Sequence, residues 1–445
     1  MHRLPSTSRR AALPWTLAAL GVLTSGCRGE DISNDCELQG QAYFQRVQQE
    51  AVDLVTPVPE RGPYPVALQL TEDGINRLLG GAIADQDVPF TGTLPLGPAL
   101  ADFEPESEPI IAFADVPGCR NCILFTLDFG ISLYSGNNPI SSGPGNVTLS
   151  IPMRLESDET AGVSTLIADY SQAKVEDLFL FVYGIDSTEH DTLTGALKVL
   201  LTERIQEEFG AVSLLEIGSW QIGEGNVRLL ARELIVRPQD GKLVLGMQTN
   251  LPLPAGSGID LAGELPPDIP MAVTMDTDLF LTMSHRMFDE GQIARRYDEG
   301  GNADPDGLYG VTLMDMVGSE VSPQLDSTFR VWRTQEGYCG FAEAIMPLDV
   351  KVNNTATGID ITPGDATVVD GEGYGVGALQ DPALVEDNQD LVSTFRSSLA
   401  DAVGTTINYD ALDLDGSTIL FGVRDVAVDA STINSYLDFI VVKDE

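Results

Sequence analysis

The stretch LTGALKVLLTERIQEEFG, residues 193–210, contains the pattern that decides the fold. Its large apolar residues recur at every fourth position, namely Leu197, Leu201, Ile205 and Phe209. Because residues four apart lie on one face of an α-helix, this spacing predicts an amphipathic helix over about residues 193–209. Gly210 follows directly and is typical of a helix C-terminus. The chain is therefore expected to contain one long helix with a narrow apolar face.

A second copy of this pattern lies near the C-terminal end, formed by Leu391, Phe395, Leu399, Val403 and Gly404. A second landmark is also repeated, since IPMRL at residues 151–155 is answered by MPLDV at residues 346–350. The separation along the chain between the two copies is almost the same for both landmarks and differs by one residue. The sequence therefore predicts a tandem repeat. A further match pairs residues 68–71 with residues 281–284, each expected to be a strand tip that leads into a helix cap.

Strand patterns surround the first helix. Phe125, Leu127, Phe129, Ile131 and Leu133 alternate with smaller or polar residues, which predicts a strand with one apolar face. Further strands are predicted near residues 147–155, 163–170, 175–183, 214–222, 227–236 and 243–250. Upstream we expect a helix over residues 37–55, a strand over 66–70 and a short helix capped by Thr71. Residues 90–117 are rich in proline and acid, which predicts a long loop or irregular edge.

These elements indicate the α+β class. We expect two tandem domains, residues 63–250 and 271–445, each a highly twisted antiparallel sheet wrapped around a long amphipathic helix. The proline-rich stretch 251–270 is interpreted as the linker between them. Residues 27–62 would form an N-terminal tether and helix. The length of 445 residues suits this division, because one domain takes about 150 residues.

The N-terminus has the pattern of an export signal. Three arginines stand among the first ten residues, and an apolar stretch of about 13 residues follows, too short to span a bilayer. Small residues then lead into Cys27, which resembles a bacterial lipobox with Cys27 as the lipidation site and residues 1–26 as the signal peptide. The alternative is an ordinary secretory signal with Cys27 in a disulfide. Arg28, rather than aspartate, follows the cysteine, and this favours the outer membrane of a Gram-negative cell envelope.

The charge balance restricts the possible partners. The chain has 25 basic and 67 acidic residues, a formal net charge of −42. Such a surface repels nucleic acid and anionic headgroups, so nucleic-acid binding is excluded. Adaptation to a salty or calcium-containing exterior is a simpler explanation of this charge than an acid-specific partner.

Four cysteines remain after Cys27, namely Cys36, Cys119, Cys122 and Cys339. In an exported chain four cysteines indicate two disulfides, with three possible pairings. Cys119 and Cys122 have the spacing of a redox or zinc pair. A zinc site would need a second pair or nearby histidines, and a redox pair would open a helix rather than precede a strand-like run. A structural disulfide is therefore the preferred interpretation.

Catalytic motifs and cofactor loops are absent from the sequence. It contains no G-x-S-x-G elbow, no H-E-x-x-H and no glycine-rich phosphate loop, so neither an enzyme nor a cofactor is predicted. His190 lies in a polar run and is expected in a loop. His285 is interpreted as a partly buried structural residue.

One stretch resembles the start of a calcium loop. Asn302, Asp304 and Asp306 offer oxygen ligands at alternating positions before a glycine. The twelfth position is Leu313 instead of the glutamate that closes such a loop. An acidic surface turn is the simpler interpretation, and no metal is predicted.

The order of elements resembles the tubular lipid-binding (TULIP) superfamily and its two-domain bactericidal/permeability-increasing protein family. The resemblance covers about residues 37–445. It depends on the stretches ADY at 168–170 and VEDL at 175–178, and on the helix-then-two-strands ending of each half. It implies lipids or other apolar ligands as partners and no catalytic motif. The acidic surface departs from endotoxin-binding members, which are basic.

This resemblance implies apolar grooves between helix and sheet, because two apolar faces that do not fully interdigitate leave room for acyl chains. The groove candidates are Leu197, Leu201, Ile205, Phe209, Leu391, Phe395, Leu399 and Val403. Each of these residues could equally fill a closed core. The expected function is that of a membrane-anchored lipoprotein which binds or shuttles lipids. The alternative is a non-catalytic surface or scaffold lipoprotein that binds protein or glycan.

Overall fold

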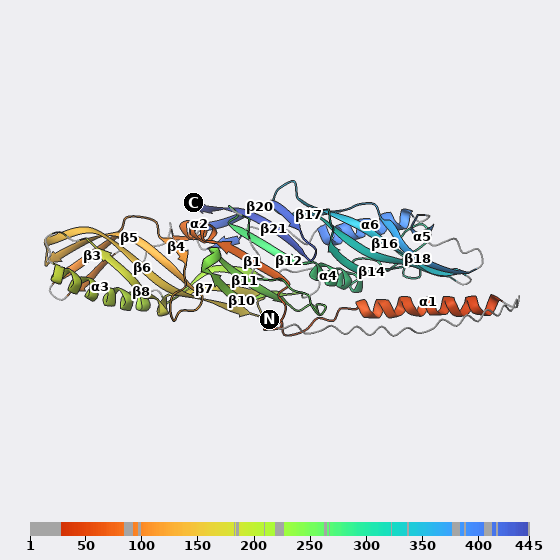
Figure 1. Cartoon of the computed structure of the whole chain (residues 1–445), viewed down its shortest axis with the longest axis horizontal. Coiled ribbons are helices and arrows are strands. Elements are labelled where there is room, and N and C mark those ends of the chain that lie inside the picture. The colour runs from red at the N-terminus through yellow and green to blue at the C-terminus, as the bar shows by residue number, and fades with distance from the viewer. Residues whose placement is uncertain are drawn as a thin grey trace, which may run out of the picture.

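The computed structural model is elongated, with sheets arranged along its long axis (Figure 1). It describes residues 28–83, 92–96, 99–181, 183, 187–208, 210–218, 227–261, 265–266, 268–321, 323–335, 338–375, 383–386, 389–404, 412–414 and 417–443. Strands in the described part pair antiparallel and form three sheets. The expected α+β class with curled antiparallel sheets is confirmed at that level.

The central sheet contains strands from both ends of the chain. Its order is β10 (Leu229–Arg237), β11 (Lys242–Thr249), β1 (Val66–Thr71), β12 (Met271–Asp276), β21 (Thr432–Lys443), β20 (Ser417–Val428) and β19 (Leu412–Leu414). Strand β1 pairs with β11 on one side and with β12 on the other. The proline-rich stretch that follows β11 therefore connects two strands of one sheet.

A second sheet lies at one end of the central sheet. It consists of β2 (Gly92–Leu96), β3 (Ala99–Pro105), β4 (Ile110–Phe113), β5 (Cys122–Ser135), β6 (Asn138–Asp158), β7 (Val163–Asp169), β8 (Lys174–Leu180) and β9 (Ala211–Gly218). Helix α3 (Ser187–Glu208) packs against it. We call this sheet with α3 the first half.

The third sheet lies at the opposite end (Figure 1). It consists of β13 (Arg296–Tyr297), β14 (Tyr309–Gly318), β15 (Gln324–Gln335), β16 (Tyr338–Val352), β17 (Ile359–Pro363) and β18 (Thr367–Gly375). Helices α4 (Thr277–Asp289), α5 (Ala383–Glu386) and α6 (Gln389–Gly404) accompany it. We call this group the second half. Its long strand β16 pairs with β15, β17 and β18, just as β6 pairs with β5, β7 and β8.

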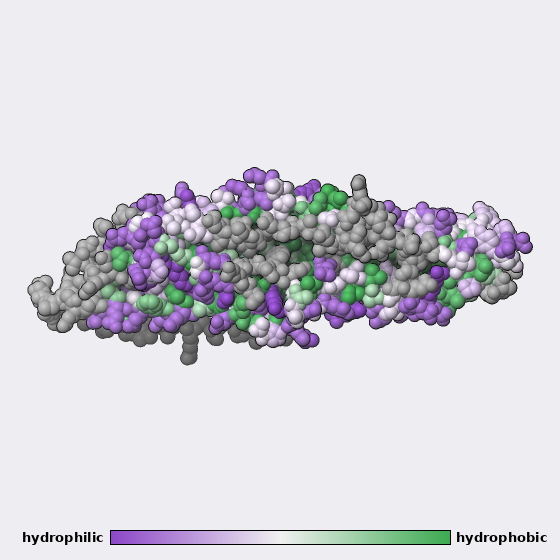
Figure 2. Space-filling model, turned by 180° about the vertical axis from the view of Figure 1, so that it is seen from behind, coloured by the Kyte–Doolittle hydropathy of each residue, from purple (hydrophilic) through white to green (hydrophobic). Residues whose placement is uncertain are grey.

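Most of the apolar interior is continuous, and a small separate cluster consists of Ala67, Val244 and Leu261. Buried side chains of the central sheet, of both halves and of α2 (Glu72–Ile83) belong to one hydrophobic cluster. On the face shown in Figure 2, hydrophilic residues cover much of the visible surface and hydrophobic residues lie between them in small groups. No helix in the described part of the chain is long and apolar enough to cross a membrane.

Two sequence predictions about local structure were wrong. Residues 90–117 contain β2, β3 and β4 instead of one long loop. The sheet tolerates the prolines because Pro95 lies on β2, an edge strand, and Pro105 ends β3. Residues 281–284 lie inside α4 instead of forming a strand tip. The strand that leads into α4 is β12, and its last residue Asp276 caps the helix by accepting from the backbone N–H of Asp278 at 2.8 Å.

The N-terminal helix is also displaced from its predicted position. Helix α1 spans Arg28–Glu50, so it begins earlier than expected and ends before the prolines. It packs against β14, β15, β16 and β18.

The predicted cap at Thr71 is present at the start of α2, since the Thr71 hydroxyl accepts from the backbone N–H of Gly74 at 3.1 Å.

Candidate functional site

Helix α3 fills the space between two edge strands of the first half. Among the described strands, β2 pairs only with β3 and β8 only with β6. From α3, Arg204 donates to the carbonyl of Thr93 on β2 at 3.4 Å, and Lys198 donates to the carbonyl of Glu176 on β8 at 2.6 Å. The helix therefore contacts both edges, and we call this place the seam.

The predicted apolar face of α3 points away from solvent. Leu197, Leu201 and Ile205 are 0%, 5% and 3% exposed. All three belong to the continuous hydrophobic cluster. The fourth candidate, Phe209, lies outside the described residues. The structure thus brings the described candidates of this helix together on the inner side of the seam.

Polar side chains of α3 contact the edge of the sheet near β8 at regular intervals. His190, Lys198 and Gln206 donate to the backbone carbonyls of Leu180, Glu176 and Ala173 at 2.7, 2.6 and 2.9 Å. The expectation of a loop at His190 was wrong, because the polar run is the first turn of α3. Carbonyls at a sheet edge need such partners, since an unpaired backbone group away from water is costly.

Helix α6 carries the second set of candidates. Leu391, Phe395 and Leu399 are each 1% exposed. The Phe395 ring stacks on Phe288 of α4 at a centroid distance of 6.2 Å and lies 5.1 Å from Phe329 of β15. Val403 lies in α6, but its side chain is outside the described part. These residues fill the space between α6 and the sheet of the second half, and Phe395 connects α6 to both α4 and β15.

Asn302, Asp304 and Asp306, which resemble the start of a calcium loop, lie in the loop between β13 and β14. The Asp298 carboxylate accepts from the backbone N–H groups of Gly300 and Asn302, both at 2.8 Å. The Asn302 backbone N–H is the main reason why the pKa of Asp298 lies below its ordinary value. Asp304 accepts from the backbone N–H of Asp306 at 2.9 Å. The carboxylates of Asp298 and Asp304 thus cap the turn, and no group of three metal-ligating side chains occurs in the described residues.

The structure shows a buried ionic cluster that no sequence pattern indicated. The Glu50 side chain at the end of α1 is 1% exposed and lies 2.7 Å from Arg295 and 3.0 Å from Arg46. Burial raises the pKa of Glu50, and the two guanidinium groups oppose that shift. Arg295 also lies 3.2 Å from Asp289 of α4. No local pattern signals this cluster, because Glu50 and Arg295 are 245 positions apart.

His285 of α4 lies close to this cluster. Its Nε2 lies 2.7 Å from the carbonyl oxygen of Leu313 on β14. Burial lowers the pKa of His285 to about 4. A neutral imidazole that donates to a backbone carbonyl has a structural role, which agrees with the interpretation of His285 as a partly buried structural residue.

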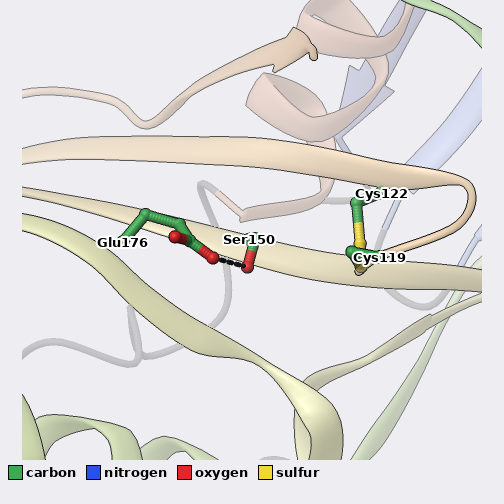
Figure 3. The surroundings of a disulfide bond; sticks show 4 residues. All are labelled: Cys119, Cys122, Ser150 and Glu176. Atoms are coloured by element: carbon green, nitrogen blue, oxygen red, sulfur yellow. Dashed lines mark hydrogen bonds between the residues drawn. A yellow bond between two sulfur atoms is a disulfide. The ribbon is translucent and has the colours of Figure 1, made fainter. Parts of the chain in front are cut away.

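The structure selects one of the three possible disulfide pairings. Cys36 of α1 is bonded to Cys339 of β16, across 303 positions, and Cys119 to Cys122. Figure 3 shows the second bond beside the hydrogen bond from Ser150 to Glu176, which measures 2.6 Å. Inside the Cys119–Cys122 turn, Asn121 donates to the carbonyl of Leu234 on β10 at 2.7 Å. The Cys119–Cys122 disulfide therefore closes a turn that connects the sheet of the first half to the central sheet. Cys27 lies outside the described residues.

Two hollows formed by described residues have mixed linings that include several carboxylates. One, of about 610 Å³, contains the buried Lys242, whose Nζ donates to Gln69 at 3.1 Å, with Asp73, Asp240 and Asp268 also in the lining. The other, of about 670 Å³, is lined by Glu106 and by residues of β2, β3, β5 and β6, including Asp102, Glu104, Gly130, Ser132 and Tyr134. Carboxylates line both, so neither suits an acyl chain.

Matches to solved structures cover most of the chain at low similarity. A lipopolysaccharide binding protein is 11% identical, covering 86% of this chain and 100% of that one, with a TM-score of 0.37. The P47 protein of Clostridium botulinum E1 is 11% identical over 85% and 100%, with a TM-score of 0.38. P47 from Clostridium botulinum A2 is 10% identical over 84% and 97%, with a TM-score of 0.40. No protein-family model and no curated protein sequence matches the chain.

Proposed function

We propose that this protein is a cell-envelope lipoprotein, acylated at Cys27, that binds or shuttles lipids or other acyl chains. Its ligand sites would be apolar grooves between helix and sheet in two tandem units of the tubular lipid-binding type. The proposal includes no catalytic step. It places the protein at the outer membrane, with lipid and the bilayer as its partners.

The observation that supports this function is the position of α3. Its apolar face, with Leu197, Leu201 and Ile205, is buried against a curled sheet whose edges β2 and β8 do not pair with each other. Within the described part of the chain, α3 is therefore the helix that separates the apolar interior from solvent at the seam. A linear apolar ligand needs an apolar, concave surface that buries most of its length.

The second unit follows the same order of elements. Strands β6 and β16 each pair with three strands, and a long helix follows β8 in the first half and β18 with α5 in the second half, namely α3 and α6. Leu201 and Leu399 are buried on these helices. This correspondence supports the tandem organisation inferred from the repeated sequence.

The position of α1 agrees with an anchor at Cys27. The helix begins at Arg28 and lies alongside the second half (Figure 1). The disulfide from Cys36 and the ion pair from Glu50 fasten it at two places. An acyl group on Cys27 would then be held at the N-terminal end of a fixed helix.

The test is lipid capture by the purified protein. Native mass spectrometry of the Cys27→Ser variant is expected to detect co-purified phospholipid, and the variant should take up a fluorescent fatty acid. Leu201→Trp should lower that uptake at least tenfold, because the added ring fills the space behind α3. Val199→Trp is the matched control, since Val199 lies on the same helix and is 56% exposed. If no lipid co-purifies and no fatty acid binds, lipid binding is wrong.

A surface or scaffold lipoprotein is the second candidate. Phe179, Phe181 and Tyr183 are 58%, 49% and 68% exposed at alternating positions, and the rings of Phe181 and Tyr183 lie 5.0 Å apart. Exposed aromatic residues in a row are frequent in protein and glycan interfaces. Phe179→Ser with Phe181→Ser would then abolish capture of a partner protein while leaving fatty-acid uptake unchanged.

A further inference from the structure

We propose that the Cys119–Cys122 disulfide is a thiol-exchange site, and that its reduction by a dithiol releases one end of the join between the first half and the central sheet. The inference goes beyond the proposed function and does not depend on lipid binding. It follows from the place of the disulfide beside the edge of β10 and from the contacts of Asn121, which lies between the two cysteines.

Strand β10 is an edge strand of the central sheet, because among the described strands it pairs only with β11. On its other side, the Asn121 side chain takes the place of a strand. Its Nδ2 donates to the carbonyl of Leu234 at 2.7 Å, and its Oδ1 accepts from the backbone N–H of Val236 at 3.3 Å. A side-chain amide thus pairs with the sheet edge in the way that the backbone of a further strand would.

The hairpin of β6 and β7 contacts the same edge of β10. Ser157 of β6 donates to the carbonyl of Ala231 at 2.8 Å, and Ser164 of β7 accepts from the Ala231 backbone N–H at 2.9 Å. Glu159, in the turn of the hairpin, pairs with Arg232. These contacts lie nearer the start of β10 than the amide contacts do. Loss of the amide contacts would therefore open one end of the join, while the hairpin keeps the other end in place.

The disulfide holds Asn121 in the conformation that makes these contacts. The φ angle of Asn121 is +56°, in the left-handed region that asparagine adopts more readily than most residues but at some cost. Its backbone carbonyl also accepts from the N–H of Met153 on β6 at 2.9 Å. The bonded cysteines on either side restrict the turn to this conformation. Without that covalent restriction, the backbone of residues 119–122 gains other conformations, and the amide leaves the β10 edge.

The two sulfur atoms of the disulfide in Figure 3 differ in their access to solvent. Cys122 is 2% exposed, whereas Cys119 is partly buried and lies between two exposed residues. A Cβ added at Gly118 would meet no atom within 4 Å, and the Arg120 side chain is 86% exposed. A thiolate can therefore approach Cys119 through open space, and the positive charge of Arg120 attracts it.

The reduction proceeds by thiol–disulfide exchange. One thiolate of the dithiol attacks the Cys119 sulfur, a mixed disulfide forms there, and Cys122 leaves as a thiolate that takes up a proton. The second thiol of the reagent loses its proton and attacks the reagent sulfur of the mixed disulfide, which releases Cys119 as a thiolate that is protonated in turn. Two electrons and two protons pass from the dithiol to the protein, and the dithiol becomes a cyclic disulfide.

The Cys36–Cys339 disulfide provides the internal comparison. Its cysteines are 303 positions apart, against three for Cys119 and Cys122, and Cys339 is 1% exposed. A bond that closes a long loop stabilises the native chain more, so it is more difficult to reduce. In the folded full chain, dithiothreitol followed by alkylation and peptide mapping should label Cys119 and Cys122 about tenfold faster or more. Equal rates for the two pairs would refute a thiol-exchange site.

Amide hydrogen exchange, resolved to single residues, tests the release of β10. After reduction of Cys119–Cys122, or in the Cys119→Ser/Cys122→Ser variant, the N–H of Val236 should exchange about tenfold faster, because its acceptor on Asn121 is lost. The N–H of Ala231 should keep its rate, and so should the N–H groups of β15 in the second half. Unchanged exchange at Val236 would overturn the proposal. Equally faster exchange in β15 would overturn it too, since the whole chain would then unfold.

The Asn121→Gly variant separates the amide contacts from the disulfide. Glycine adopts a φ angle of +56° without strain, so the turn and its disulfide should form as in the native chain. The oxidised variant should already show the fast exchange at Val236, and reduction should add almost nothing. If reduction accelerates the exchange of this variant as much as that of the native chain, the disulfide does not act through Asn121, and the proposal is wrong.

Discussion

The Glu50 carboxylate and the Arg295 guanidinium lie 2.7 Å apart and join the end of α1 to the segment after α4. Removing one member of a buried ion pair leaves the other uncompensated, which costs about 3 kcal/mol. Glu50→Gln is therefore expected to lower the free energy of unfolding by about that amount in urea titrations. Glu37→Gln, an exposed position on the same helix, should have almost no effect. Equal effects of the two variants would contradict a stabilising role of the cluster.

The depressed pKa of His285 predicts a pH dependence of stability. The native imidazole stays neutral down to about pH 4, whereas an unfolded histidine takes up a proton near pH 6.5. The unfolded state then binds more protons in this window, so stability falls as the pH falls through it, by up to about 3 kcal/mol. His285→Gln should remove this part of the acid sensitivity. The measurement is the difference in urea midpoint between pH 7.5 and pH 4.5, which should be smaller for the variant than for the native protein.

The two disulfides are expected to differ in their contribution to stability. Cys36 and Cys339 are 303 positions apart. Closing such a long loop lowers the conformational entropy of the unfolded chain, which stabilises the native state by about 5 kcal/mol. The bond between Cys119 and Cys122 closes a very short loop, which gives about 2 kcal/mol. Thermal unfolding of the Cys36→Ser/Cys339→Ser and Cys119→Ser/Cys122→Ser variants compares them. A larger loss for the short loop would show that the turn around Asn121 matters more than the chain entropy.

Two glycines provide a matched test of how α6 is held. Gly301 and Gly291 have φ angles of +78° and +75°, so a side chain at either position strains the backbone by about 1 kcal/mol. A Cβ at Gly301 would also collide with the backbone of Asp390, whereas a Cβ at Gly291 meets open space. Gly301→Ala should therefore destabilise the protein by about 2 kcal/mol more than Gly291→Ala. Equal losses in denaturant titrations would mean that the loop yields without disturbing α6.

Patterns local in sequence predicted α3, α6 and the long strands around α3, because burial on one face leaves a periodic trace. The spacing of Leu197, Leu201 and Ile205 located α3, and all three are buried. The same principle failed for residues 281–284, where a four-residue window could not separate strand from helix. Asp276 followed by apolar residues at helical spacing, such as Leu279 and Met283, was the signal that could have identified α4.

Relationships distant in sequence were not predictable. No pattern indicated that β1 would pair with β12, or that α1 would lie on the second half. The candidate site shows the same limit. Periodicity located the buried faces of α3 and α6. The seam depends instead on the positions of β2 and β8 as edge strands of the sheet, which no local pattern indicates. The contacts of His190 and Gln206 with backbone carbonyls leave no trace in side-chain identity.

The pairing of β1 with β12, and of β12 with β21, has a consequence for the order in which the chain can fold. Strand β1 can pair only after β11 and β12, which begin at residues 242 and 271, have been synthesised. Strand β12 in turn pairs with β21, which begins at residue 432. Contacts this distant form slowly, because each must close a long loop of unfolded chain. During synthesis, the first half can assemble early while the central sheet keeps an open edge at β12. Chains shortened before β21 would expose that edge, and they are expected to aggregate or be degraded.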